Sequence, residues 1–92
     1  MNPVELYERY AALIQDDFVP YWNRFADREK GGVLNCIDNV GAARLGDWKF
    51  TWSQGRYLWL LGRLYELAEK GVLPKLDRED LANQMRGTYR FI

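Results

Sequence analysis

Residues 47–71, DWKFTWSQGRYLWLLGRLYELAEKG, decide the fold class of this chain. From Ser53 to Lys70 the pattern is helical, with Gly71 at the C′ position and Pro74 shortly after, an order typical of a helix stop. Apolar side chains surround this helix except for a narrow strip of small or charged residues: Gly55, Gly62, Glu66 and Glu69. The pattern therefore predicts a buried helix that packs on several sides.

Two arginines interrupt this apolar pattern. At about 100° per residue, Arg56 shares one face with Lys49, Trp52, Trp59, Leu60, Arg63 and Leu67. A buried guanidinium needs a carboxylate, a carbonyl or a polar cavity, because an unpaired charge is costly to bury. Indole rings beside a guanidinium also suit the C–H faces and hydroxyls of a sugar. Arg56 is thus interpreted either as a sugar-binding residue or as half of a structural salt bridge, and Arg63 as structural.

The N-terminal segment predicts another helix, starting at Pro3. Asn2 can cap it, Pro3 has no N–H to lose, and Glu5 stands at the third helical position. Apolar residues recur at helical spacing along one stripe: Leu6, Tyr7, Tyr10, Leu13, Ile14 and Phe18. Pro20 is expected to kink or end this helix, with a further helical turn over 21–25 and a loop over 26–32.

A small β-hairpin is predicted between these two helices. Residues 33–38, VLNCID, alternate along the chain, the sequence NVG then supplies a turn, and residues 48–52 can pair back. A third helix follows, with Asp77 as its cap and Leu81, Met85 and Tyr89 on its apolar side. It runs to Ile92 without a capping signal, so we expect a chain that is incomplete at its C-terminus.

Composition excludes several classes of function. Lys plus Arg and Asp plus Glu both total 13 and are scattered, so no nucleic-acid partner is expected. No segment reads as a signal peptide or a membrane span, and the single Cys36 cannot form an intrachain disulfide, which together predict a cytoplasmic protein. The chain contains no histidine, so a metal or acid–base site would depend on carboxylates.

No other motif predicts chemistry. The acidic residues of the first helix fit a solvated face: Glu5, Glu8, Asp16 and Asp17. Gly31-Gly32 reads as a turn, because it lacks the spacing of a phosphate-binding loop. Cys36 is interpreted as a small buried apolar residue. No metal site and no cofactor are predicted.

The order of motifs from Phe18 to about Glu66 resembles the opening of the N-acylglucosamine 2-epimerase family, which includes cellobiose 2-epimerases and aldose–ketose isomerases. Pro20 and Trp22 form a Pro-x-Trp, and Gly31-Gly32 precedes a short strand and Asp38. A Lys-x-x-Trp-x-Gln-x-Arg pattern then follows, formed by Lys49, Trp52, Gln54 and Arg56.

The resemblance implies a mainly α fold in which residues 1–92 are the N-terminal part of one (α/α)6 barrel, with about three helices and the small hairpin. It implies that the 53–70 helix belongs to the inner ring around a sugar pocket. Arg56 matches the family's active-site arginine, which binds the sugar and favours an anionic, enediol-like intermediate. Trp52 would form a wall of the pocket. The full-length protein could form a homodimer.

This chain lacks the later inner helices that carry the family's proton-transferring histidines. We therefore expect a sugar 2-epimerase or isomerase segment that is inactive alone. Two alternatives stay open. One is another (α/α)6 carbohydrate-active enzyme, such as a glycoside hydrolase with a carboxylate pair. The other is a non-catalytic interaction domain.

Overall fold

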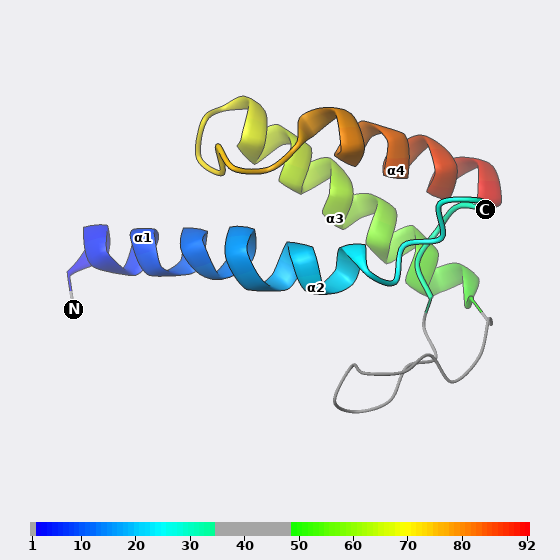
Figure 1. Cartoon of the computed structure of the whole chain (residues 1–92), viewed down its shortest axis with the longest axis horizontal. Helices are drawn as coiled ribbons and strands as arrows, with labels where there is room; N and C mark the ends of the chain where they lie inside the picture. The colour runs from blue at the N-terminus through cyan, green and yellow to red at the C-terminus, as the bar shows by residue number, and fades with distance from the viewer. Residues whose placement is uncertain (1, 35–48) are drawn as a thin grey trace.

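The computed structural model describes residues 2–34 and 49–92, and these are mainly helical, as predicted. A long helical rod consists of α1 (Pro3–Leu13), a π-helical stretch (Ile14–Phe18) and α2 (Val19–Asn23). The chain then forms a loop, and α3 (Thr51–Glu69) and α4 (Arg78–Phe91) follow as a helical pair. Figure 1 shows α3 running obliquely to the rod, with the two termini at opposite ends of the molecule.

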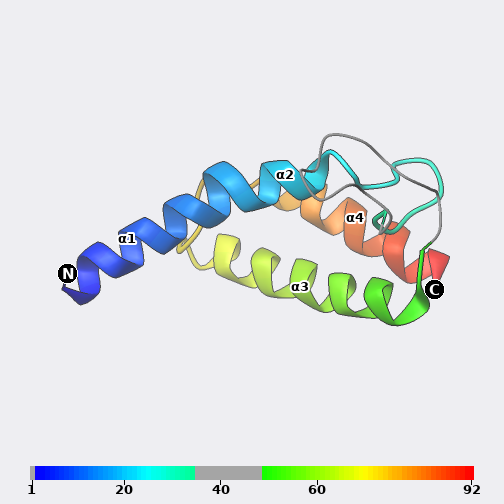
Figure 2. The same ribbon diagram turned by 90° about the horizontal axis from the view of Figure 1, so that it is seen from below.

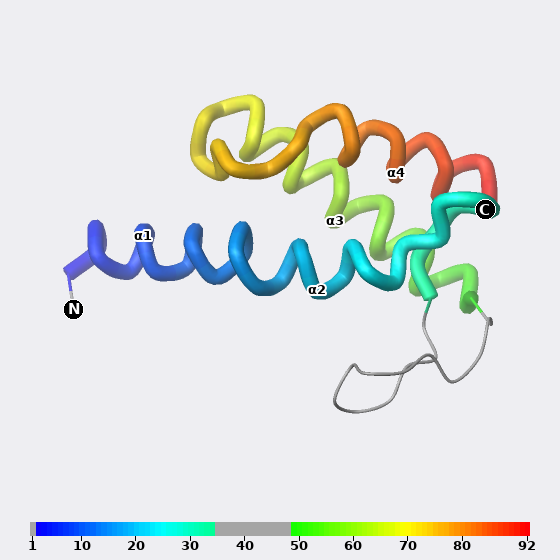
Figure 3. The backbone as a smooth tube through the Cα atoms, in the orientation of Figure 1, coloured from blue at the N-terminus to red at the C-terminus, as the bar shows by residue number. Residues whose placement is uncertain are grey.

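The first helix begins where the sequence predicts. Asn2 is its N-cap, Pro3 is its first residue, and the Asn2 side chain accepts a hydrogen bond from the Glu5 N–H at 2.9 Å. The predicted apolar stripe is only partly buried, because Ile14 packs on the core whereas Leu6, Tyr7, Tyr10 and Phe18 remain exposed. The backbone tube in Figure 3 shows the reason, since the N-terminal part of α1 extends beyond the α3–α4 pair.

Pro20 does not end the rod, which stays helical to Asn23. The wide π-helical turn lies directly before it, and the Val19 N–H bonds to the carbonyl of Ile14, five residues back. A proline lacks the N–H of the helical ladder and its ring crowds the preceding turn, so a wider turn relieves both problems. The predicted kink takes this form, and the rod bends between α1 and α2 in Figure 2.

The loop predicted over 26–32 is confirmed, but it folds back on itself. Ala26 and Val33 form an isolated antiparallel bridge, and the Leu34 N–H donates to the carbonyl of Phe25 at 2.9 Å. Most of the predicted hairpin, with Cys36 and Asp38, lies outside the described residues. Its second strand is wrong at the end that is described, because Thr51 and Trp52 begin α3 after the extended Phe50.

Both predicted caps of the α3–α4 pair are confirmed. Gly71 follows α3 with a φ of 80°, and the Asp77 side chain accepts the Asp80 N–H at 3.2 Å at the start of α4. On α4 the predicted apolar side is correct for Leu81 and Met85 but wrong for Tyr89, which is exposed. Thr88 takes the buried position instead, because α4 turns that neighbouring residue toward the rest of the structure.

Two apolar clusters hold the elements together. The larger has Leu61, Leu64, Leu73 and Leu81 at its centre, and Ile14 and Val19 of the rod pack against it. The smaller contains Phe25, Val33 and Leu34. Tyr57 packs against both clusters and so joins α3 to the loop as well as to the main core.

The loop also meets α4 backbone to backbone. Gly31 has a φ of 89°, and a Cβ added there would lie 2.1 Å from the Gly87 carbonyl oxygen.

Gly31→Ala should therefore lower the free energy of unfolding by about 2 kcal/mol or more, because it combines an unfavourable φ with a backbone clash. Gly55→Ala is the control, since nothing lies within 4 Å of a Cβ at this position in α3. It should raise stability by about 0.5–1 kcal/mol. Chemical denaturation of both variants measures the difference, and equal stabilities would contradict the close packing.

Candidate functional site

One polar side chain of α3, Gln54, is fully buried and bonds to the loop that follows α2. Its exposed fraction is 0%, and its carboxamide bonds to both polar backbone groups of Val33. The Val33 N–H donates to Oε1 at 2.7 Å, and Nε2 donates to the Val33 carbonyl at 2.9 Å. With Gln54 turned inward, residues two positions before and after it face outward, because each residue turns a helix by about 100°.

The outward face of α3 carries the residues that the sequence singled out. Trp52 is 71% exposed and Trp59 is 65% exposed, and Arg56 lies between them in sequence and is also exposed. Leu60 and Arg63 are exposed as well. The predicted common face is thus confirmed for these residues but not for Leu67, which packs against the larger apolar cluster. The prediction of a helix buried on nearly all sides is wrong for the described structure, since Gln54, Leu61 and Leu64 are the buried positions of α3.

An open, largely apolar groove runs beside this face between α2 and α3. Trp22 of α2 lines it together with residues of α3 and the loop: Val33, Ser53, Arg56, Tyr57, Trp59 and Leu60. Within residues 2–34 and 49–92, Arg56 has no hydrogen bond and no ion pair. The described part of the chain therefore contains no structural salt bridge for Arg56.

Arg63, one face-repeat further along α3, differs from Arg56. Its Nη1 lies 2.8 Å from the Glu66 carboxylate, and Lys70 approaches the same carboxylate at 3.5 Å. These are surface pairs within one helix and stabilise it by only a few tenths of a kcal/mol. The interpretation of Arg63 as structural fits this geometry.

Lys49 does not share the outward face, because α3 begins only at Thr51. Its side chain is 4% exposed, and its Nζ lies 2.5 Å from Asp27 Oδ2 and 2.9 Å from the Gly31 carbonyl oxygen. Nζ also lies 4.6 Å from the centre of the Phe91 ring. Lys49 therefore holds the loop against the ends of α3 and α4. Of the four residues in the Lys-x-x-Trp-x-Gln-x-Arg pattern, Lys49 and Gln54 act as anchors, and Trp52 and Arg56 are presented to solvent.

A polar network that the sequence reading missed connects α4 to the rest of the site. The Tyr57 hydroxyl donates to Gln84 Oε1, and Gln84 Nε2 donates to Asn23 Oδ1 and to Asp80 Oδ2, both at 2.9 Å. Burial raises the pKa of Tyr57 to about 12, so its hydroxyl stays protonated at neutral pH. From the sequence alone, Gln84 would be expected to face solvent, because most of its neighbours in the helix are polar. Its position three residues after Leu81, which the sequence places on the apolar side of this helix, is the signal that could have identified it.

The remaining candidates stay apart from this groove. Glu5, Glu8, Asp16 and Asp17 are exposed, as predicted, and Asp16 pairs with Lys75 at 3.2 Å. In the described ranges, no three histidine, cysteine, aspartate or glutamate side chains converge as a metal site would require. No described helix has both the length and the apolar character needed to cross a membrane.

These observations define a helical protein that presents an arginine between tryptophans beside an open groove. Comparison with known proteins then gives its relatives. Over 62 residues the chain is 36% identical to the N-acylglucosamine 2-epimerase of Bos taurus, a match that covers 66% of this chain and 14% of that protein. Over 56 residues it is 36% identical to the N-acylglucosamine 2-epimerase of Homo sapiens, covering 60% of this chain and 13% of that protein.

The resemblance to the N-acylglucosamine 2-epimerase family is thereby confirmed as a partial match. The chain spans about one seventh of the length of these curated relatives. No family model matches it. No solved structure matches it either.

The Asp27–Lys49 contact predicts how stability depends on pH. Hydrogen bonds from the Lys30 N–H, the Lys49 ammonium and the Glu29 N–H lower the pKa of Asp27 to about 2, against an ordinary value of 3.8. Because the folded state has the lower pKa, this stabilisation is complete above about pH 5 and is lost as the pH falls toward 2. Asp27→Asn should cost about 1–2 kcal/mol at pH 7 and much less at pH 2. Urea denaturation across this range measures the effect, and a cost that is independent of pH would contradict it.

Proposed function

We propose that this chain supplies the first helices and the substrate-binding arginine of a sugar 2-epimerase or aldose–ketose isomerase. In this proposal residues 1–92 are the N-terminal part of a single (α/α)6-barrel domain, and α3 belongs to its inner ring. The observation that carries the proposal is Arg56, which has no partner among the described residues and lies on the same face as Trp52 and Trp59. The family of the matched proteins supports the reaction class.

The proposed chemistry is proton transfer at C2 of an open-chain sugar. A base removes the proton from C2, and the electron pair moves toward the carbonyl at C1, which gives an enediolate. Return of a proton to the other face of C2 restores the C1 carbonyl and gives the epimer. Where C2 carries a hydroxyl, delivery of the proton to C1 together with transfer of the O2 proton to O1 gives the ketose. Negative charge develops on oxygen in this step, and a fixed guanidinium stabilises such charge more than it stabilises the neutral ground state.

Arg56 and Trp52 have complementary roles in this proposal. The guanidinium donates hydrogen bonds from a planar group with fixed geometry. It can therefore bind a sugar hydroxyl and stabilise the negative charge that develops on oxygen. The exposed indole of Trp52 offers an apolar surface for the C–H face of the ring or chain. Arg56 is the catalytic residue proposed here, and Trp52 contributes substrate binding.

The proton-transferring groups are proposed to come from elsewhere. The chain contains no histidine, and the groove beside Arg56 is lined by no carboxylate within the described residues. The 92 residues alone are therefore proposed to bind sugar without turning it over. Proton transfer at C2 requires no redox cofactor. The proposed partner is a small sugar, in a cytoplasmic protein that forms a homodimer at full length and binds no nucleic acid.

A second candidate is a non-catalytic interaction domain. It is favoured by the large apolar side chains that are exposed along α1, among them Tyr7 and Tyr10. This candidate predicts a cooperatively folded chain that has no affinity for sugars.

A chimera tests the enzyme proposal directly. The matched segment of the Bos taurus N-acylglucosamine 2-epimerase is replaced by the matched segment of this chain, and exchange of the C2 proton of N-acetylmannosamine is followed by NMR in D2O. The chimera should be active. Arg56→Gln should lower kcat/KM by about 100-fold or more, because one charge-stabilising donor group is lost. Arg56→Lys should lower it at least about tenfold, because an ammonium cannot reproduce the planar fork.

Arg63→Lys is the matched control and should stay within about twofold of the unsubstituted chimera, since Arg63 pairs only within its own helix. Thermal unfolding identifies any variant that has lost its fold. A chimera that unfolds normally but does not exchange the proton would contradict the proposal. Equal activity of the Arg56 variants and the Arg63 control would return Arg56 to a structural role.

A further inference from the structure

We infer that Gln54 is the positioning residue for Arg56, a role that rests on the proposed function of Arg56. The buried carboxamide of Gln54 holds α3 in the rotation that places the guanidinium at the groove. Gln54 itself does not contact the substrate in this proposal.

The geometry of the contact leaves the carboxamide one orientation. Oε1 accepts from the Val33 N–H at 2.7 Å while Nε2 donates to the Val33 carbonyl at 2.9 Å. A planar amide with one acceptor and one donor end can satisfy both backbone groups of a residue at once, which neither a carboxylate nor a thioether can do. Both backbone groups and the side chain are buried, so none of them can turn to water instead.

The loop is shaped to receive this side chain. A Cβ added to Gly32 would lie 2.5 Å from Gln54 Oε1, so the absence of a side chain there admits the carboxamide. Val33 is itself fixed, because it pairs with Ala26 and packs in the cluster with Phe25 and Leu34. Gln54 thus bonds to a backbone segment that cannot easily follow a movement of α3.

Helix geometry carries this restraint to Arg56. Arg56 lies two residues after Gln54, about 200° around the axis, so an inward Gln54 turns Arg56 outward. Tyr57, the next residue, points inward to Gln84. The two inward contacts therefore lie on either side of Arg56 in sequence and oppose rotation of α3 about its axis.

The same contact fixes the far wall of the groove. Trp22 lines the groove from α2, and α2 continues into the loop that contains Val33. Because Gln54 bonds that loop to α3, it sets the position of Trp22 relative to Arg56. A role limited to stability predicts something different, namely that Gln54 variants bind sugar normally in whatever fraction of molecules remains folded.

The test uses the whole 92-residue chain with Gln54→Met, which keeps the length and removes both hydrogen bonds. Leu73→Val is the stability-matched control, because Leu73 is 1% exposed and lies in the α3–α4 connection at the opposite end of α3. Two readouts are taken on the folded protein. The first is the affinity for N-acetylglucosamine from tryptophan fluorescence, and the second is the set of NMR proximity signals between the Trp22 ring and the side chains of Arg56 and Leu60.

Gln54→Met should weaken sugar affinity at least about fivefold and alter the Trp22–Arg56 signals, because a small displacement of a binding group has a large effect on recognition. Leu73→Val should keep the affinity within about twofold and the signals unchanged, at a comparable loss of melting temperature. Wild-type affinity and wild-type signals in folded Gln54→Met would overturn the inference. Equal losses in both variants would also overturn it.

If Gln54→Met does not fold, Gln54→Glu is used to test the inference instead. It keeps the acceptor for the Val33 N–H and, when ionised, loses the donor to the Val33 carbonyl. It should weaken sugar affinity about threefold or more and reduce the Trp22–Arg56 signals, and unchanged values would overturn the inference. If the unsubstituted chain binds no sugar, the proposed function fails, while the proximity signals still report whether Gln54 sets the rotation of α3.

Discussion

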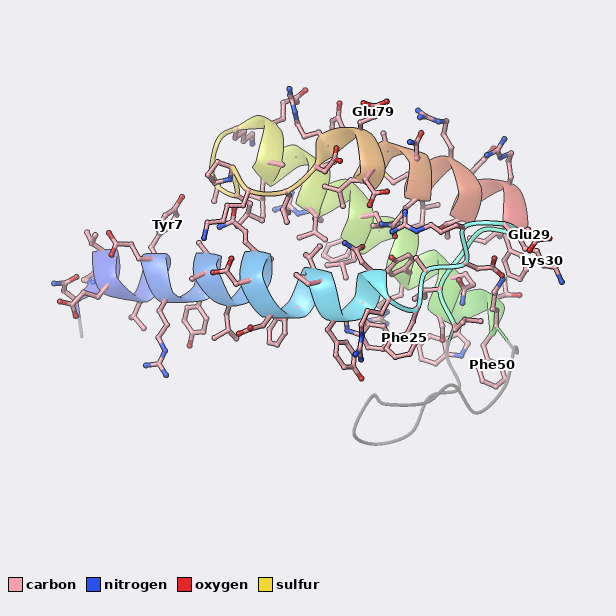
Figure 4. All side chains as sticks on the ribbon, viewed as in Figure 1. Tyr7, Phe25, Glu29, Lys30, Phe50 and Glu79 are labelled. Atoms are coloured by element: carbon pink, nitrogen blue, oxygen red, sulfur yellow. The ribbon has the colours of Figure 1, made fainter. Side chains whose placement is uncertain are left out.

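The two hydrogen bonds between the Gln54 carboxamide and Val33 are the constraint on which the rest of the structure depends. The loop from Ala26 to Val33 has few apolar residues of its own, so it needs partners on the helices. It gains them through Gln54, through the Lys49–Asp27 pair and through the close approach of Gly31 to Gly87. These contacts gather α2, α3 and α4 at one end of the molecule, where Figure 4 shows Phe25, Glu29, Lys30 and Phe50.

The two ends of α3 are held by different kinds of contact, apolar packing at one end and hydrogen bonds at the other. Toward its C-terminal end, Leu61 and Leu64 pack with Leu73 and Leu81, and burial of apolar surface supplies the stabilisation. Toward its N-terminal end, Gln54 and Tyr57 contribute directional hydrogen bonds to Val33 and Gln84. Apolar packing alone tolerates sliding and rotation, whereas satisfied buried polar groups specify one arrangement. The N-terminal end of α3, whose arrangement these hydrogen bonds specify, also carries Trp52 and Arg56.

The sequence predicted local features well because local signals determine them. The Asn2 and Asp77 caps and the stop at Gly71 each depend on residues within one turn of the helix end. The predictions from sequence were wrong where contacts between residues far apart in the chain determine which side chains are buried. A hydrophobicity wheel cannot show that Gln54 takes an inward position while Trp52 and Trp59 face solvent, because the partner of Gln54 lies 21 residues away. The family resemblance directed attention to Arg56, but it did not distinguish the anchoring residues of the pattern from the exposed ones.

The exposure of Arg56 has a consequence for chemistry. In water, the attraction between a guanidinium and an enediolate is weak, about 1 kcal/mol at 4 Å, and it becomes several times stronger only where the surroundings exclude water. An open groove can therefore bind a sugar through its indole surfaces and donor fork without stabilising charge enough for catalysis. Because Trp22 and Trp59 already form apolar sides to the groove, further protein over Arg56 would complete a water-excluding enclosure. In the proposed function, sugar recognition and catalysis thus have separate requirements at Arg56. The first needs the rotation that Gln54 fixes, and the second also needs a covered site with proton-transferring groups.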